Sequence, residues 1–188
     1  MIEIIKNIIQ EHPDQINAIS AICALFVSFL SIILTIWTLR LQRRHNFLSV
    51  TPIASIPISD YEDNIAVKVK NAGVGPLLIE TFRATDGMKE KDDLISWMPS
   101  LPAGVYWSTF YENLDGLCIP PGEEVVLLQL QGDENNKHFR EARDSTRRAL
   151  SSLNVTVKYK DIYNRKMSPK TRDLSWFGRH FRSKRVEQ

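Results

Sequence analysis

The feature that most constrains this chain is an uncharged apolar stretch near its N-terminus. No Asp, Glu, Lys or Arg occurs between Asp14 and Arg40, and the 22 residues 18–39 are mostly apolar. At about 1.5 Å per residue, a helix of this length spans roughly 33 Å, which is enough to cross the ~30 Å hydrocarbon core of a bilayer. A buried globular helix would carry a charged face, and a signal peptide would carry a basic segment before a shorter apolar region. We therefore predict a transmembrane helix over residues 16–41.

The charges that flank this stretch predict its orientation. Arg40, Arg43 and Arg44 follow the apolar residues, whereas Lys6 is the only basic residue before them. Because basic flanks stay on the cytoplasmic side, we expect a single-pass protein of the inner (cytoplasmic) membrane, with its N-terminus outside and its C-terminal domain in the cytoplasm. The three arginines would lie at the membrane surface in a basic linker over residues 42–50. Residues 1–13 alternate apolar and polar side chains at helical spacing, which predicts a short interfacial helix.

Small and hydroxylated residues recur along one face of the predicted membrane helix. Their spacings of three and four residues keep them on one side, where they permit close approach of a second helix. We expect this face to mediate self-association into a homo-oligomer. The alternative is that the hydroxyls bond to carbonyls of their own helix. The residues of this face are Ser20, Ala24, Ser28, Ser31, Thr35 and Thr38.

Beyond the linker the apolar periodicity changes from helical to two. Apolar residues alternate with polar ones at 65–69 and 153–159, and turn residues separate about seven short segments of this kind, including 105–111. The pattern predicts an antiparallel immunoglobulin-like β-sandwich over residues 51–175. One helix at about 135–150, which Asp133 could cap, interrupts the strands, and a short helix is expected at 92–98. The fold class is thus an N-terminal transmembrane α-helix followed by a mainly β domain.

Three short motifs give the chain a resemblance to a known group. They are N-A-G-V-G-P at 71–76, L-C-I-P-P-G-E-E at 117–124 and V-K-Y-K-D-I-Y-N at 157–164. With the membrane helix and its basic flank, they make the chain similar to small bacterial single-pass membrane proteins with a cytoplasmic immunoglobulin-like β-sandwich. The architecture also resembles membrane effectors of antiviral systems, some of which respond to cyclic nucleotides. Because the three motifs are turn sequences, the resemblance implies only a fold and, through the membrane helix, a location.

Charge is divided unevenly along the chain. Residues 45–136 have a net charge of −9 and residues 137–188 a net charge of +10, although the whole chain has a formal net charge of +2. Arg140, Arg143 and Arg147 share one face of the predicted helix, with Arg148 beside them. Arginine presents a planar fork of donors, so we predict an anion site there. The alternative is a solvated face whose aliphatic stems pack on the domain.

The C-terminal tail, residues 176–188, mixes aromatic and basic side chains. Such a mixture suits an anionic membrane surface, and lipid is a more suitable partner here than nucleic acid because the chain is membrane-tethered. No DNA partner is expected. The tail residues predicted to contact the membrane surface are Trp176, Arg179, Arg182, Lys184 and Arg185.

Nothing in the sequence indicates catalysis. The four histidines are scattered without metal-ligand spacing, and two cysteines, Cys23 and Cys118, exclude a four-cysteine zinc site. Cys118 has apolar neighbours and is expected to be a buried thiol. We therefore expect no enzyme, no metal and no cofactor.

Two functions remain open. In the first, the chain is a membrane effector of antiviral defence. Its β-sandwich binds an anionic signal such as a cyclic nucleotide, and binding triggers perturbation of the membrane. In the second, it is a non-enzymatic structural or adaptor protein that scaffolds a membrane-associated complex, with the acidic residues 60–134 meeting the basic segment of a neighbour. In both cases the expected partners are the lipid bilayer and other copies of the chain.

Overall fold

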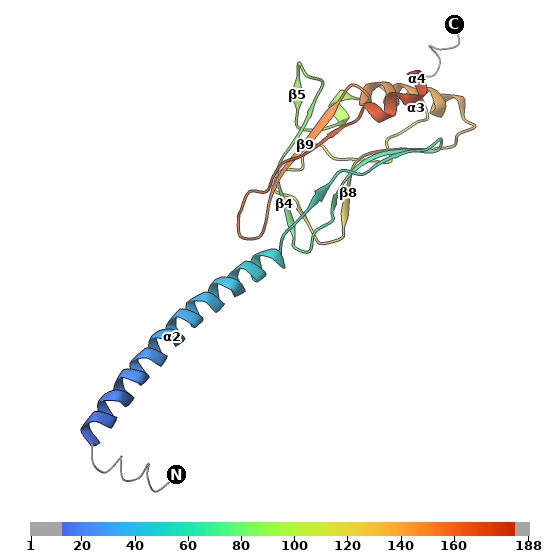
Figure 1. The fold of residues 1–188 in the computed structure, drawn as a ribbon. Coiled ribbons are helices and arrows are strands. Elements are labelled where there is room, and N and C mark those ends of the chain that lie inside the picture. The colour runs from blue at the N-terminus through green and yellow to red at the C-terminus, as the bar shows by residue number, and fades with distance from the viewer. Residues whose placement is uncertain (1–12, 183–188) are drawn as a thin grey trace. The chain divides into compact units, whose positions relative to one another are not determined.

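The computed structural model describes residues 13–182, and the chain divides into two compact units at Leu48 and Ser49 (Figure 1). The interfacial helix predicted for residues 1–13 falls almost wholly outside the described residues. We call the second unit, from Ser49 onward, the β domain.

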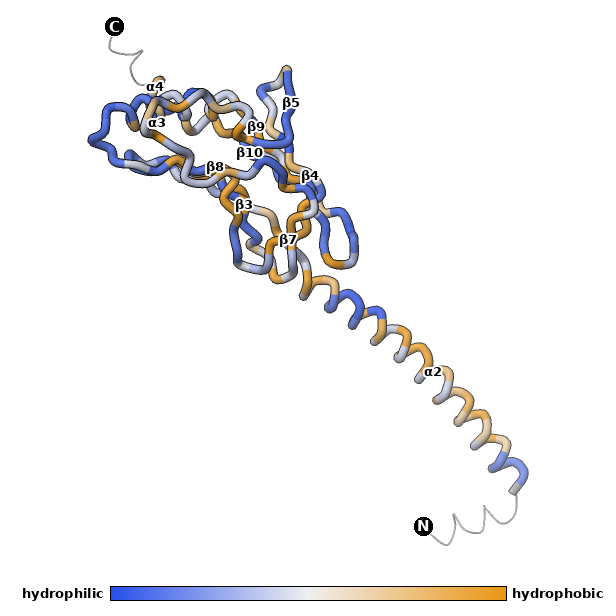
Figure 2. The backbone as a smooth tube through the Cα atoms, turned by 180° about the vertical axis from the view of Figure 1, so that it is seen from behind, coloured by the Kyte–Doolittle hydropathy of each residue, from blue (hydrophilic) through white to orange (hydrophobic). Residues whose placement is uncertain are grey.

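The first unit is one long apolar helix, α2 (Pro13–Leu48). Pro13 occupies the first turn, where its missing N–H costs nothing, and neither glycine nor proline occurs again before Pro52. The segment from Asn17 to Leu48 is long and apolar enough to span a membrane, and Figure 2 shows the middle of α2 as predominantly hydrophobic. The helix continues through most of residues 42–50, where a linker was predicted, because nothing in that stretch breaks it.

The β domain contains two antiparallel sheets, as the alternating pattern predicts. Each sheet has five strands. In the first, the order is β1-β3-β8-β6, and β2 also pairs with β3; in the second, the order is β10-β9-β4-β5, and β7 also pairs with β4. The strands are β1 (Ala54–Ser55), β2 (Ile58–Asp60), β3 (Asn64–Asn71), β4 (Leu77–Thr85), β5 (Glu90–Lys91), β6 (Thr109–Phe110), β7 (Cys118–Ile119), β8 (Glu124–Gln131), β9 (Asn154–Lys160) and β10 (Lys170–Asp173).

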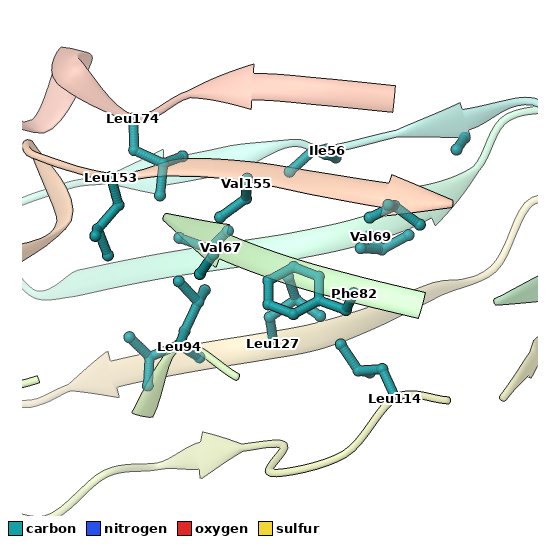
Figure 3. Packing of buried hydrophobic residues seen from close by; sticks show 14 of the residues in the cluster. Ile56, Val67, Val69, Phe82, Leu94, Leu114, Leu127, Leu153, Val155 and Leu174 are labelled. Carbon is teal, nitrogen blue, oxygen red and sulfur yellow. The ribbon is translucent and has the colours of Figure 1, made fainter. Parts of the chain in front are cut away.

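Buried side chains from both sheets form one apolar cluster (Figure 3). Val67 and Val69 come from β3, whereas Phe82 comes from β4 and Val155 from β9, and all four are at most 1% exposed. On β9 the buried residues alternate with polar ones, which is the pattern of a strand with one face in the core. Burial of this apolar surface is the main force that holds the two sheets together.

Three local predictions differ from the structure in detail. The long helix is α3 (Lys137–Leu150), and its N-cap is Asn136, whose side chain accepts hydrogen bonds from the backbone N–H of His138 and Phe139. Asp133, the predicted cap, instead accepts from the backbone of Asn135 one turn earlier. The helix expected at 92–98 is a single 3-10 turn, η1 (Ile95–Trp97). Of the strand expected at 105–111, only β6 forms, because the preceding residues leave the sheet as a loop.

Strand register defines two ends of the β domain. We call one end the tether end, because it contains residues 49–53, which follow α2 in the chain. The bend 71–76, the turn 119–123 and the β9–β10 loop lie at the same end, since Leu77 pairs with Ile119 and Leu78 pairs with Lys160. The far end contains Asp60, which pairs with Ile65, and the start of β9, where Asn154 pairs with Thr85. Figure 1 shows α3 and α4 at the far end and the β9–β10 loop at the other.

A buried asparagine fixes the tether end. The Asn71 side chain donates to the carbonyls of Gly75 (2.7 Å) and Ile119 (3.0 Å) and accepts from the backbone N–H of Gly73 (3.0 Å). Gly75 lies so close to the chain that a Cβ would be 1.8 Å from the Val50 carbonyl oxygen. The N-A-G-V-G-P motif therefore anchors the first residues of the β domain.

Candidate functional site

Two of the four arginines of the predicted anion site are buried. Arg143 is 7% exposed and Arg147 is 2% exposed, on the face of α3 that packs against the β domain. The amphipathic sequence of α3 explains this, because Phe139, Ala142, Thr146 and Leu150 bury the same face. Arg140 and Arg148 lie on the exposed surface of the helix.

Carboxylates of the same chain neutralise the two buried arginines. Arg147 Nε donates to Asp60 Oδ1 at 2.8 Å, and Arg143 Nη1 pairs with the carboxylate of Glu62. Asp144, on the same helix, lies 3.0 Å from Arg143 Nε and 3.4 Å from Arg147 Nη1. A buried ion pair stays charged only when its partners satisfy each other in this way. The arginines of α3 therefore do not form one open cationic surface.

Asp60 is the centre of this cluster. Its side chain is 2% exposed and receives Arg147 from α3 and Arg179 from α4 (Arg179–Arg182). His180 Nε2 lies 3.3 Å from Asp60 Oδ2. The cluster thus joins β2, α3 and the C-terminal segment, which is a structural arrangement that the sequence did not indicate. The acidic residues 60–134, which include Asp60 and Glu62, were expected to meet the basic segment of a neighbouring molecule. In the structure, Asp60 and Glu62 instead pair with arginines of their own chain.

The predicted basic tail is partly folded against the far end of the β domain. Phe177, in the 3-10 turn η2 (Ser175–Gly178), is completely buried in the core cluster, and Arg179 stacks on the Trp176 ring at 4.5 Å. Trp176 itself is 56% exposed. Arg182 lies in α4, whereas Lys184 and Arg185 lie outside the described residues. The β domain therefore extends past residue 175, where the tail was predicted to begin.

The small-residue face of α2 has its hydroxyls bonded within the helix. Ser28, Ser31, Thr35 and Thr38 each donate to the carbonyl four residues earlier, at 2.8 Å. This is the alternative that the sequence left open for the hydroxyls. Ser20 and Ala24 complete the face. Arg40, Arg43 and Arg44 lie exposed in the last third of α2.

Two hollows on the β domain share the loop residues Val105, Tyr106 and Trp107. One, of about 320 Å³, extends toward Asp133 and Asn136 at the start of α3, and the other, of about 400 Å³, toward Leu101 and Phe110. Neither is lined by a Lys, Arg or His side chain. Both hollows have aromatic side chains and the first also has the Asp133 carboxylate, so they suit an apolar or neutral ligand better than a phosphate.

The described residues contain no cluster of three or more His, Cys, Asp or Glu side chains that could hold a metal ion. Cys118 is an exposed free thiol, so the expectation of a buried one was wrong. It lies on the outward face of the short strand β7, whose other residue, Ile119, is buried.

Comparisons with known proteins place the chain in no family. No protein-family model, no curated protein and no solved structure matches it.

Proposed function

We propose that the protein is a single-pass membrane protein whose β domain, an immunoglobulin-like sandwich on the cytoplasmic side, is a non-catalytic adaptor that scaffolds a membrane-associated complex. The observation that carries the proposal is the direct continuation of an apolar helix of membrane-spanning length into a folded domain. Leu48 ends α2, and the next residue, Ser49, already belongs to the β domain.

The state of the arginines favours an adaptor over a sensor of anionic signals. A ligand that used Arg143 and Arg147 would have to displace Asp60 and Glu62, and it would leave the buried Asp60 carboxylate with fewer partners. At this cluster the buried arginines Arg143 and Arg147 pair with Asp60 and Glu62 and so hold α3 against the β domain. A scaffold requires a domain that keeps one shape.

The two native cysteines test this proposal. We expect a membrane-impermeant maleimide to label Cys118 only after the cytoplasmic membrane is opened, because its exposed thiol would be on the cytoplasmic side. Cys23, within the predicted bilayer span, should stay unlabelled until detergent is added. The variants C118S and C23S assign each signal to one thiol. Labelling of Cys118 in intact cells would contradict the orientation, and release of the protein from membranes by alkaline carbonate would contradict the membrane anchor.

A membrane effector of antiviral defence is the second candidate, and one observation keeps it in view. Arg140 and Arg148 remain exposed on α3, so an anionic signal such as a cyclic nucleotide has two accessible guanidinium groups. Binding of a cyclic nucleotide to the purified full chain, and its loss in the variant R140A/R148A, would favour this function. Absence of binding to any cyclic nucleotide would remove it.

A further inference from the structure

The loop between β9 and β10 exposes two apolar side chains at its tip. Ile162 is 49% exposed and Tyr163 is 52% exposed. Burial of these apolar side chains would stabilise the protein, so their exposure is unfavourable. The surrounding hairpin, residues 158–170, contains five basic residues and one acidic residue. Its basic residues are Lys158, Lys160, Arg165, Lys166 and Lys170.

The tip is held in one conformation by a buried carboxylate. Asp161 Oδ1 accepts from the backbone N–H of Tyr163 and of Arg165, both at 2.9 Å, and Oδ2 accepts from Arg165 Nε at 2.7 Å. Asn164 adopts a positive φ of 64°, which closes the turn. The exposure of Ile162 and Tyr163 is therefore built into an ordered loop.

Much of the positive charge of this hairpin is not neutralised within the chain. Asp161 pairs with Arg165, and Lys166 Nζ lies 3.7 Å from Glu80. Throughout the described part of the chain, no carboxylate forms an ion pair with Lys158, Lys160 or Lys170. This differs from the far end, where carboxylates hold Arg143, Arg147 and Arg179. With five basic residues and one acidic residue, the β9–β10 hairpin has a net charge of +4, out of the +10 of residues 137–188.

The hairpin tip lies at the tether end of the β domain. Lys160 pairs with Leu78, directly after the bend that Asn71 fastens to residues 51–53. Two further exposed apolar side chains belong to the same end, Ile53 (53% exposed) and Val74 (65% exposed). This is also the end at which the chain arrives from α2, since Ser49 follows Leu48.

We infer that the β9–β10 hairpin is a second membrane contact, in which Ile162 and Tyr163 enter the interface of a bilayer rich in anionic lipid and the neighbouring lysines bind its headgroups. The inference rests on the proposed function, because it needs α2 in a membrane and the β domain on the anionic side. Exposed apolar and aromatic side chains among cations are the chemistry that an anionic lipid surface recognises. A hairpin tethered next to that surface binds at a high effective concentration, so few side chains suffice.

The test uses the full chain in lipid nanodiscs. With Cys23 and Cys118 replaced by serine, a single cysteine is introduced as I162C and labelled with an environment-sensitive dye. Lipids brominated on their acyl chains then quench any label that enters the bilayer. The matched control is M88C: Met88 is 95% exposed, in the β4–β5 loop at the far end, where Thr85 pairs with Glu90.

We expect strong quenching of the I162C label in discs that contain phosphatidylglycerol, weaker quenching in pure phosphatidylcholine, and little quenching of the M88C label in either. The triple variant K158Q/K160Q/K170Q should abolish the dependence of quenching on anionic lipid. Each charge removed should weaken the affinity of the hairpin for the anionic surface about fivefold. Equal quenching at positions 162 and 88 would overturn the inference and leave a protein partner as the occupant of the hairpin. Failure of the chain to incorporate into discs would instead refute the membrane anchor, so the two failures are distinguishable.

Discussion

At the scale of single residues, Asp60 joins strand β2 to both α3 and α4. Its carboxylate, 2% exposed, neutralises Arg147 and pairs with Arg179, so Asp60→Ala would leave a buried guanidinium without its main counter-ion. We expect the free energy of unfolding to fall by about 3–5 kcal/mol. Urea unfolding of the full chain in detergent, followed by tryptophan fluorescence, would measure it.

The control for this measurement is Arg140→Ala. Arg140 belongs to the same predicted site, but its side chain is exposed on α3, so the free energy of unfolding should change by no more than about 0.5 kcal/mol. Equal effects of the two substitutions would mean that the cluster around Asp60 contributes nothing specific to stability.

Asp161 gives the hairpin tip a dependence on pH. Burial raises the pKa of this carboxyl, but hydrogen bonds from the backbone and side chain of Arg165 outweigh burial and hold the pKa below its ordinary value. A lowered pKa in the folded state stabilises the loop above the pKa of the unfolded chain. This stability is lost as the pH falls below about 4 and through the folded-state pKa.

Hydrogen exchange measures this effect directly. After correction for intrinsic rates, the amides of Tyr163 and Arg165 should lose protection as the pH is lowered from about 7 to about 3. In D161N the same amides should be poorly protected at every pH, because the charged acceptor is gone. Protection of these amides that is independent of pH in the unsubstituted chain would contradict the assigned role of Asp161.

At the scale of elements, α2 combines a span of membrane length with a face of small side chains. Because its hydroxyls already bond to carbonyls of the same helix, close packing rather than hydrogen bonding between helices would drive association. We expect S28L/S31L to reduce the oligomer to monomers in mild detergent, as measured by light scattering. The variant I22L, on a different part of the helix, is the control. An unchanged oligomer in S28L/S31L would exclude this face, and dissociation by salt alone would point to contacts between charged surfaces.

At the scale of the whole molecule, short-range patterns predicted more than long-range contacts. The period-two alternation at 65–69 and 153–159 predicted strands that form as β3 and β9, and the helix predicted at about 135–150 forms as α3. These signals lie within one element, so a linear sequence displays them. The pairing of Asp60 with Arg147 joins residues 87 positions apart, and no periodicity indicates which distant carboxylate an arginine will meet. For that reason the arginines of α3 were predicted to form an open anion site.

The pairing of Arg179 with Asp60 also sets an order of events during synthesis. The two residues are 119 positions apart, and a ribosome adds about 5–20 residues per second, so Arg179 follows Asp60 by roughly 6–24 s. Phe177, which completes the apolar core, is equally late. The residues of α2 are all translated before Asp60. The whole of the apolar helix α2 is therefore translated while the β domain still lacks Phe177, so the membrane insertion that we propose would have a head start of several seconds over folding of the β domain.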